Sequence, residues 1–351
     1  GVTSKNLRIH QLQTNGGQLI NELKNIAIIF LSAYAVIEGV FSLGVMLAIQ
    51  FIIGQLNVPL NKMMAFLLDY QKAELALRRL FEVWNEEPEG HDLNPVEKKA
   101  HESIGLHDVS FRYGPPGTKA ALSHVSITIP KGKVTAIVGY SGSGKSTLLK
   151  LLLQFHSPTE GEITVGNILL SSIAPRVWRE NCGVVLQEGS LFEDTIERNI
   201  TESKSKAPLD KDRFETALSY AMLKGFVDDL PHGTKTKIGE NGIRLCGGEK
   251  QRILMARAIY KDPDYFFLDE ATSSLDSINE KGILNNLDSF NKNRTVVIVA
   301  HRLSTIRNAD NIIVLDNGIV KEQGTHQDLL GKKGVYWKLV QYQMDAVDYG
   351  R

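Results

Sequence analysis

Cysteine is scarce in this chain, which has only two among its 351 residues, Cys182 and Cys246. Two cysteines so far apart provide neither a disulfide framework nor a metal cluster, and they favour a reducing compartment. Neither charge is in excess, because 40 basic residues balance 40 acidic ones. This balance gives no indication of a nucleic-acid partner or an acidic tail. The first residues do not show the order of basic, apolar and small residues that is typical of a signal peptide.

Charged residues are nearly absent from one long stretch near the N-terminus. Between Lys24 and Lys62 the sequence contains no Lys or Arg, and Glu38 is the only acidic residue. Residues 26–56 are a stretch of 31 residues that is almost entirely apolar. One membrane span needs about 20 residues, so this length exceeds one span and falls short of two.

Basic residues flank this stretch on both sides and indicate its topology. They are Lys5, Arg8 and Lys24 before it, and Lys62, Lys72, Arg78 and Arg79 after it. If both flanks face the cytoplasm, the segment must cross the membrane and return. We therefore expect a helical hairpin that turns between Glu38 and Gly44, with its first helix beginning near Leu19. A single buried or tilted helix is the alternative.

The composition changes twice after the apolar stretch. Residues 63–84 are amphipathic at helical spacing, as expected for a helix that leaves the bilayer. A segment with prolines, glycine and mixed charges follows and predicts a linker. We expect a transmembrane part at residues 1–86, a linker at 87–101, a globular domain at 102–343 and a tail at 344–351.

The globular part shows the pattern of an α/β domain. Residues 106–112 and 122–129 alternate like antiparallel strands. Short apolar runs, several of them separated by helical stretches, predict a largely parallel sheet. These runs lie at residues 134–138, 183–186, 265–268, 296–300 and 312–315.

The strongest motif is the pattern G-x-x-x-x-G-K-S between the predicted strand 134–138 and an apolar helical run at 148–153. This context predicts a phosphate site, in which backbone N–H groups and the helix dipole attract phosphate oxygens. The segment, here termed the phosphate loop, comprises Gly139, Tyr140, Ser141, Gly142, Ser143, Gly144, Lys145, Ser146 and Thr147. We expect Lys145 to reach the β- and γ-phosphates and Ser146 to coordinate Mg²⁺. A glycine-rich turn without a ligand is the alternative.

The predicted strand 265–268 ends in two carboxylates, Asp269 and Glu270. Open α/β sheets place their chemistry at the carboxyl ends of strands. Asp269 would hold Mg²⁺ through water, and Glu270 would orient or deprotonate an attacking water. Alone, the pattern also fits a strand that enters a solvated loop, but beside a phosphate loop it indicates nucleotide hydrolysis.

Further segments resemble the ATPases of the ATP-binding-cassette (ABC) family. The signature segment, which resembles the family's signature sequence, comprises Leu245, Cys246, Gly247, Gly248 and Glu249. Other segments are similar to its glutamine loop (Gln187), D-loop (Ser274-Leu275-Asp276), switch histidine (His301) and adenine-stacking aromatic (Tyr113). Each residue alone also fits a structural role, but their joint occurrence in the family's order over residues 102–330 favours the family.

This resemblance implies an α/β P-loop NTPase with an antiparallel β subdomain and a helical subdomain. ATP with Mg²⁺ would lie between two such domains, the phosphate loop of one facing the signature segment of the other. Gln187 would contact Mg²⁺ or the water and report the γ-phosphate to the membrane part. His301 would hold the γ-phosphate and orient Glu270. A second half-transporter, most simply a second copy, is thus the implied partner.

Two residues depart from the family pattern. Cys246 stands where the family usually has serine, and Glu249 where it often has glutamine. A thiol is a weaker hydrogen-bond donor than a hydroxyl. We therefore expect Cys246 to lower turnover without abolishing ATP binding.

Other resemblances concern the branch of the family. Residues 238–242 and 324–326 resemble exporter segments, and the hairpin resembles the last two of six spans in an exporter half-transporter. Residues 54–60 and 181–187 are most similar to peptidase-containing bacteriocin and peptide exporters. This similarity implies a peptidase domain and four spans upstream, a peptide cargo, contact with membrane lipid, and an inner-membrane protein whose ATPase faces the cytoplasm.

Three alternatives remain open. The first is a multidrug or lipid exporter of the same architecture. The second is a low-turnover regulatory half of a heterodimer, which Cys246 favours and the presence of Glu270 and His301 disfavours. The third is a soluble cassette ATPase of DNA repair or translation, which the zero net charge and the apolar hairpin disfavour.

Overall fold

The computed structural model describes residues 2–85, 101–115, 117–201, 208–239, 242–272, 274–275, 277–300 and 306–348. The chain divides into two compact units, residues 1–88 and 89–351. The predicted linker, apart from His101, lies outside the described residues. The predicted tail begins inside the last helix, which continues to Asp348.

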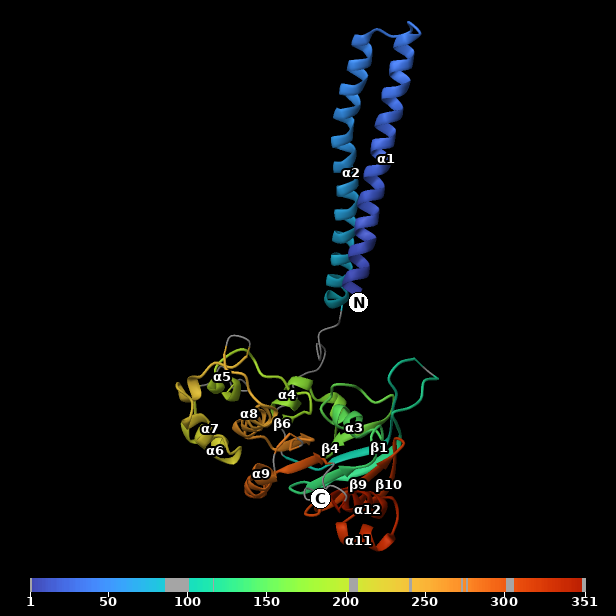
Figure 1. Ribbon diagram of the computed structural model, residues 1–351. Coiled ribbons are helices and arrows are strands. Elements are labelled where there is room, and N and C mark those ends of the chain that lie inside the picture. The colour runs from blue at the N-terminus through green and yellow to red at the C-terminus, as the bar shows by residue number, and fades with distance from the viewer. Residues whose placement is uncertain are drawn as a thin grey trace. The chain divides into compact units, whose positions relative to one another are not determined.

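The first unit is a helical hairpin (Figure 1). Helix α1 spans Val2–Ile37 and helix α2 spans Leu43–Trp84, and the two are joined by a turn at residues 38–42. The predicted hairpin and the position of its turn are confirmed. Helix α1 begins well before Leu19, because the polar residues that precede the apolar stretch also adopt helical geometry.

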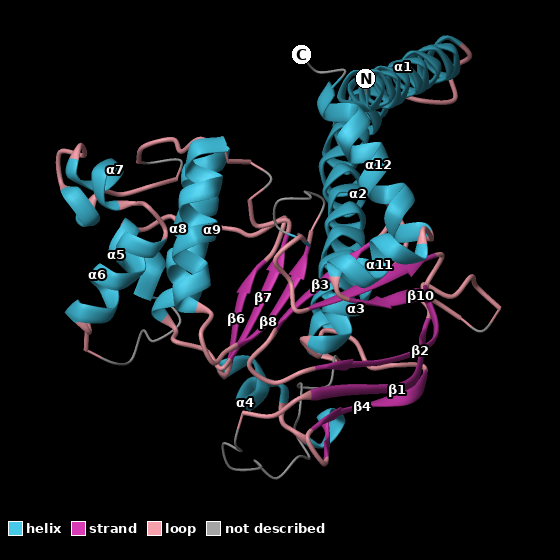
Figure 2. Cartoon of the chain, turned by 90° about the horizontal axis from the view of Figure 1, so that it is seen from below, coloured by secondary structure: helices cyan, strands magenta, loops and turns pink. Residues whose placement is uncertain are grey.

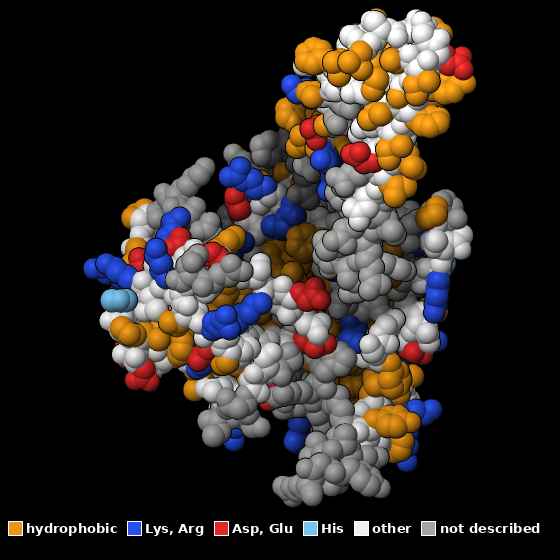
Figure 3. Space-filling model, turned by 45° about the horizontal axis from the view of Figure 1, so that its top comes forward, with side chains coloured by type: hydrophobic (Ala, Val, Ile, Leu, Met, Phe, Trp, Pro, Cys, Tyr) orange, Lys and Arg blue, Asp and Glu red, His pale blue; other side chains and the backbone are white. Residues whose placement is uncertain are grey.

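The hairpin exposes large apolar side chains (Figure 3), such as Phe30 and Phe51, each 69% exposed. In the described part of the chain, Asn15–Ile37 is long and apolar enough to cross a membrane, whereas the apolar part of α2, Leu43–Leu56, is shorter. At a rise of 1.5 Å per residue the latter extends about 21 Å, less than the roughly 30 Å of a bilayer core. One helix thus meets the criterion for a span, and the second span stays a prediction.

The second unit contains two β-sheets (Figure 2). The antiparallel sheet has the order β2-β1-β4-β5, with β1 Ile104–Phe111, β2 Leu122–Ile129, β4 Glu160–Val165 and β5 Ile168–Leu169. The second sheet has the order β10-β9-β3-β8-β7-β6 and is parallel except for β10. Its strands are β3 Val134–Val138, β6 Cys182–Val185, β7 Tyr265–Asp269, β8 Thr295–Val299, β9 Asn311–Asp316 and β10 Ile319–Gly324.

Helices cover both faces of the parallel sheet. The described helices of the second unit are α3 Lys145–Leu152, α4 Pro175–Glu180, α5 Ile196–Thr201, α6 Lys211–Tyr220, α7 Lys224–Asp228, α8 Gly247–Tyr260, α9 Ser277–Phe290, α11 His326–Lys332 and α12 Val335–Asp348, with 3₁₀ turns η1 Leu170–Ser172 and η3 Gly233–Lys235. Leucines of α3 share one core with the antiparallel sheet. Residues of α5, α6, α8 and α9 form a second core on the other face, and Figure 2 shows these helices grouped together.

Burial on both faces explains why the parallel strands are continuous apolar runs. In β7, Phe266 and Leu268 contribute to the helical core, whereas Tyr265 and Phe267 contribute to the core between the sheets. The seven predicted strands are confirmed to within two residues at each end. The sequence analysis missed β4, β5 and β10. Charged residues interrupt the apolar pattern in β4 and β10, and β5 has only two residues.

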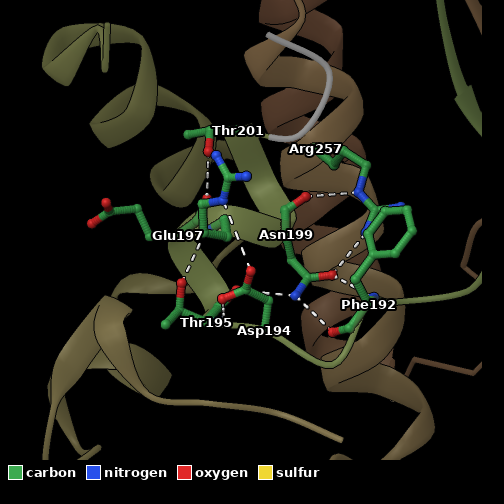
Figure 4. A network of polar contacts seen from close by, with 8 residues as sticks. Phe192, Asp194, Thr195, Glu197, Asn199, Thr201 and Arg257 are labelled. Atoms are coloured by element: carbon green, nitrogen blue, oxygen red, sulfur yellow. Dashed lines mark hydrogen bonds and ion pairs between the residues drawn. The ribbon is translucent and has the colours of Figure 1, made fainter. Parts of the chain in front are cut away.

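A buried polar cluster joins the segment before α5 to α8 (Figure 4). The fully buried Asn199 side chain accepts hydrogen bonds from the Phe192 N–H and the Arg257 guanidinium. It donates to the carbonyls of Phe192 and Thr195, both at 3.0 Å. Arg257 also donates to the carbonyls of Asn199 at 2.7 Å and Ser190 at 3.1 Å. The cluster therefore fixes the segment between β6 and α5 against α8.

We predict that Asn199→Ala lowers the free energy of unfolding by about 2 to 3 kcal/mol, because several buried donors and acceptors lose their partner. Urea unfolding of the full chain in detergent, followed by tryptophan fluorescence, measures this loss. The matched control is Asn285→Ala on the exposed face of α9, with an expected change below about 0.5 kcal/mol. Equal losses in the two variants would contradict the importance of the cluster.

Candidate nucleotide-binding site

The phosphate loop connects β3 to α3, and two of its glycines are required by close backbone contacts. Gly139 has φ 156° and Gly144 has φ 102°. A Cβ atom at Gly139 would lie 2.1 Å from the carbonyl oxygen of Leu315, and one at Gly144 would lie 2.7 Å from that of Ala121. Both distances are shorter than the 3.0 Å that real Cβ atoms keep. The loop can therefore approach its neighbours only with glycine at these positions.

The loop has the properties of a phosphate cradle. No side chain of the described residues caps the N-terminus of α3, so its first N–H groups remain available for an anion. The Ser143 hydroxyl is buried, with 3% exposure, and has no hydrogen-bond partner among the described residues. Ser146 is exposed in the first turn of α3, where a hydroxyl could reach a metal ion, and Thr147 is buried beside it. These residues fit a phosphate group with Mg²⁺.

Lys145 is buried, with 6% exposure, at the start of α3. Its Nζ donates to the carbonyls of Gly139 at 2.9 Å and Tyr140 at 3.0 Å. Burial lowers the pKa of this ammonium, and the charges of Glu270 and Asp269 partly oppose that shift. Burial is the main cause of the lowered pKa of Lys145. Phosphate oxygens would stabilise the charged ammonium as the two carboxylates do, because a nearby negative charge favours the cation.

The two carboxylates lie at the same edge of the parallel sheet as the phosphate loop. Asp269 ends β7 and Glu270 follows it, and β7 and β3 both pair in parallel with β8. Glu270 has a left-handed backbone, φ 50°, and its carboxylate accepts a hydrogen bond from Gln187 Nε2 at 3.2 Å. The fold thus brings Lys145, Asp269, Glu270 and Gln187 together, and their catalytic roles stay predictions.

Gln251, in the second turn of α8, is a residue to which the sequence analysis gave no role. Its Nε2 donates to the Glu270 carbonyl at 2.8 Å, and its Oε1 accepts from the Ser274 N–H at 3.1 Å. The side chain therefore fixes the segment after β7 to α8, the helix that begins within the signature segment. In the sequence, only its position just after the signature segment indicated that Gln251 lies near the site.

The signature segment forms the N-terminus of α8. Cys246 is the N-cap, and its Sγ accepts from the Glu249 N–H at 3.4 Å while Glu249 Oε2 accepts from the Cys246 N–H at 2.7 Å. This reciprocal pair is a capping box. Gly248 allows close contact with the D-loop, because a Cβ there would lie 3.3 Å from the Ser274 carbonyl oxygen. The two departures from the family pattern thus form one local structure, which the sequence analysis did not foresee.

Tyr113 lies in the loop after β1 and is 48% exposed. Its hydroxyl donates to Thr147 Oγ1 at 3.3 Å, so the ring lies beside the phosphate loop. His301 and Asp276, as well as Glu240 of the exporter-like segment, lie outside the described residues. Their predicted roles stay predictions.

Comparisons with known proteins agree with this geometry. Residues 122–273 match the family model described as ABC transporter. The chain is 37% identical to the alpha-hemolysin translocation ATP-binding protein HlyB of Escherichia coli O157:H7, over 99% of this chain and 49% of that protein. It is 43% identical to the ATP-dependent lipid A-core flippase of Cupriavidus pinatubonensis, over 74% of this chain and 44% of that protein.

A solved structure shows the same likeness. The chain is similar to the structure of a bacterial Atm1-family ABC exporter with ATP bound, with a TM-score of 0.71 and 31% identity. The match covers 97% of this chain and 60% of that one. The chain spans about half the length of the curated relatives that it matches.

We predict that Cys246→Ala lowers the stability of the chain by about 1 kcal/mol, because the Glu249 N–H loses its acceptor. Cys246→Ser serves as the control, since a hydroxyl keeps the cap. Thermal unfolding in detergent compares the two variants. If the alanine variant were as stable as the serine variant, the thiol would not contribute to the cap.

Proposed function

We propose that the chain carries the ATP-binding domain of an ABC transporter and is the C-terminal part of an exporter half-transporter. In this proposal, ATP hydrolysis drives transport of a cargo across a membrane. The observation that carries it is the placement of Lys145, Glu270 and Gln187 at one sheet edge beside the phosphate loop. In the proposal, this arrangement joins a phosphate cradle to a carboxylate that would act on water.

The chain's own residues would divide the chemistry as follows. The phosphate loop and Lys145 bind the β- and γ-phosphates, and Ser146, Gln187 and Asp269 hold Mg²⁺, which neutralises charge on the phosphates. Glu270 orients or deprotonates the attacking water, and its bond with Gln187 keeps the carboxylate in place. Because Gln187 donates a hydrogen bond to the Glu270 carboxylate, a movement of the Gln187 side chain would also move or release that carboxylate.

A second copy of the chain would complete the site. The signature segment, from Leu245 to Glu249, would face the γ-phosphate held by the partner, and Tyr113 would stack on the adenine. His301 would hold the γ-phosphate and orient Glu270. Donors from two subunits around the transferred phosphoryl group are an effective way to stabilise its charge. Closure of the dimer on ATP and its release after hydrolysis would drive transport.

The hairpin would contribute two spans to the membrane domain, with the ATPase in the cytoplasm. The helix α2 contains no charged residue from Leu43 to Asn61, so the second span can extend beyond its apolar part. The resemblance to peptidase-containing exporters favours a peptide cargo. A lipid cargo is the second candidate, because one relative is named a lipid A-core flippase.

The coding region upstream of Gly1 distinguishes these proposals. Four further apolar spans preceded by a Cys/His protease domain would support peptide export. Spans without a protease would remove the argument for peptide over lipid cargo. An upstream region without further spans would overturn the exporter proposal.

We predict that Glu270→Gln lowers the ATP hydrolysis rate of the full chain by at least about 100-fold, because the amide cannot act as a base. ATP binding is retained, so an ATP-dependent dimer accumulates and is detected by light scattering in detergent. The control is Glu162→Gln on β4, in the other sheet, which leaves the rate unchanged. Wild-type turnover in the Glu270 variant would contradict the assigned role.

We predict that Cys246→Ser raises turnover of the assembled dimer by about two- to fivefold, because a hydroxyl is a better donor to phosphate than a thiol. Cys246→Ala, which has no donor, is the comparison variant and lowers turnover. Phosphate release at saturating ATP measures both. An unchanged rate in the serine variant would show that the thiol does not limit the cycle.

A further inference from the structure

Three rings, those of Phe111, Tyr113 and His156, form a cluster beside the phosphate loop. Phe111 and His156 are stacked, with centroids 5.3 Å apart and an interplanar angle of 23°. Both meet Tyr113 nearly at right angles, Phe111 at 4.9 Å and 86° and His156 at 5.4 Å and 90°. Edge-to-face contacts are favoured by the charge distribution of aromatic rings. The two stacked rings therefore hold the plane of Tyr113.

Phe111 and His156 differ in burial, and each follows a segment with defined backbone contacts. Phe111 ends β1 and is 7% exposed. His156 follows the turn after α3, where the Gln154 side chain donates to two backbone carbonyls of residues 170–173. Tyr113 lies in the exposed loop that follows β1. Phe111 is thus the buried member of the cluster, and the exposed His156 stacks on it and meets the edge or face of Tyr113, so the pair limits the orientations open to the Tyr113 ring.

The third constraint on Tyr113 comes from the phosphate loop. The bond from its hydroxyl to Thr147 Oγ1 fixes the outer end of the ring beside the N-terminus of α3. With 48% of the residue exposed, Tyr113 retains surface on which a flat ligand can stack. A ligand anchored by its phosphates in the loop would place its base near this surface.

We propose that His156 is a positioning residue for the nucleobase, which with Phe111 holds the Tyr113 ring in the orientation that stacks on adenine. This inference rests on the proposed binding of ATP at the phosphate loop. It assigns His156 to base binding and not to phosphate binding, because its ring contacts are with Phe111 and Tyr113. Stacking uses the flat face that every base has, so His156 is expected to contribute equally to the binding of ATP and of GTP.

The test is isothermal titration calorimetry of the full chain in detergent with Mg²⁺, using ATP and inorganic tripolyphosphate as separate probes. His156→Ala is expected to raise the Kd for ATP about three- to tenfold, the size of one lost aromatic contact. The Kd for tripolyphosphate stays unchanged. His156→Phe, which keeps a ring at this position, restores the ATP affinity. The matched control is His232→Ala, at an exposed histidine of another loop.

The outcomes separate this inference from the proposed function. If Tyr113→Ala weakens ATP binding and His156→Ala does not, the role of His156 is overturned while ATP binding at the loop stands. Equal weakening of ATP and tripolyphosphate by His156→Ala would indicate a structural role and would also overturn it. If the wild-type chain binds neither probe, the proposed function itself fails.

Discussion

At the carboxyl edge of the parallel sheet, the phosphate loop comes closer to neighbouring backbone than a side chain permits. The missing Cβ atoms of Gly139 and Gly144 allow contacts with β9 and with the segment before β2. This fit places the start of α3, and with it Lys145, between the two sheets. Lys145 is consequently buried and its ammonium is poorly hydrated, which lowers its pKa. A cation in such a place interacts with phosphate more strongly than one in water.

Two side chains of α8, the Gln251 amide and the Arg257 guanidinium, connect this edge of the sheet to other segments of the second unit. Gln251 holds the segment that follows Glu270, and Arg257, two turns further along, holds the segment that follows β6 through Asn199. Because both contacts are on the helix that begins at the signature segment, a shift of α8 would move both segments. The structure therefore gives a physical route by which a partner at the signature segment could affect Glu270.

The sequence predicted those parts whose pattern is local. Strands β3, β7 and β8 were recognisable because both their faces are buried, and the phosphate loop because its glycines and lysine are consecutive. Strand β10 was missed because it alternates between exposed and partly buried residues. Gln251 and His156 were missed for another reason: their contacts join residues far apart in the sequence, and no single-residue property marks them.

The signature segment shows how two departures from a family pattern combine. In isolation, Cys246 weakens a donor and Glu249 replaces one polar side chain by another. In the structure, the Glu249 carboxylate accepts the Cys246 N–H, while the Cys246 sulfur accepts the Glu249 N–H. In the proposed dimer the Cys246 N–H lies in the segment that faces the γ-phosphate, so the Glu249 carboxylate and the phosphate would compete for this donor and for the same helix dipole. In that dimer Glu249 would have to release the Cys246 N–H before a phosphate could accept from it, and its charge would oppose closure more than a neutral glutamine would.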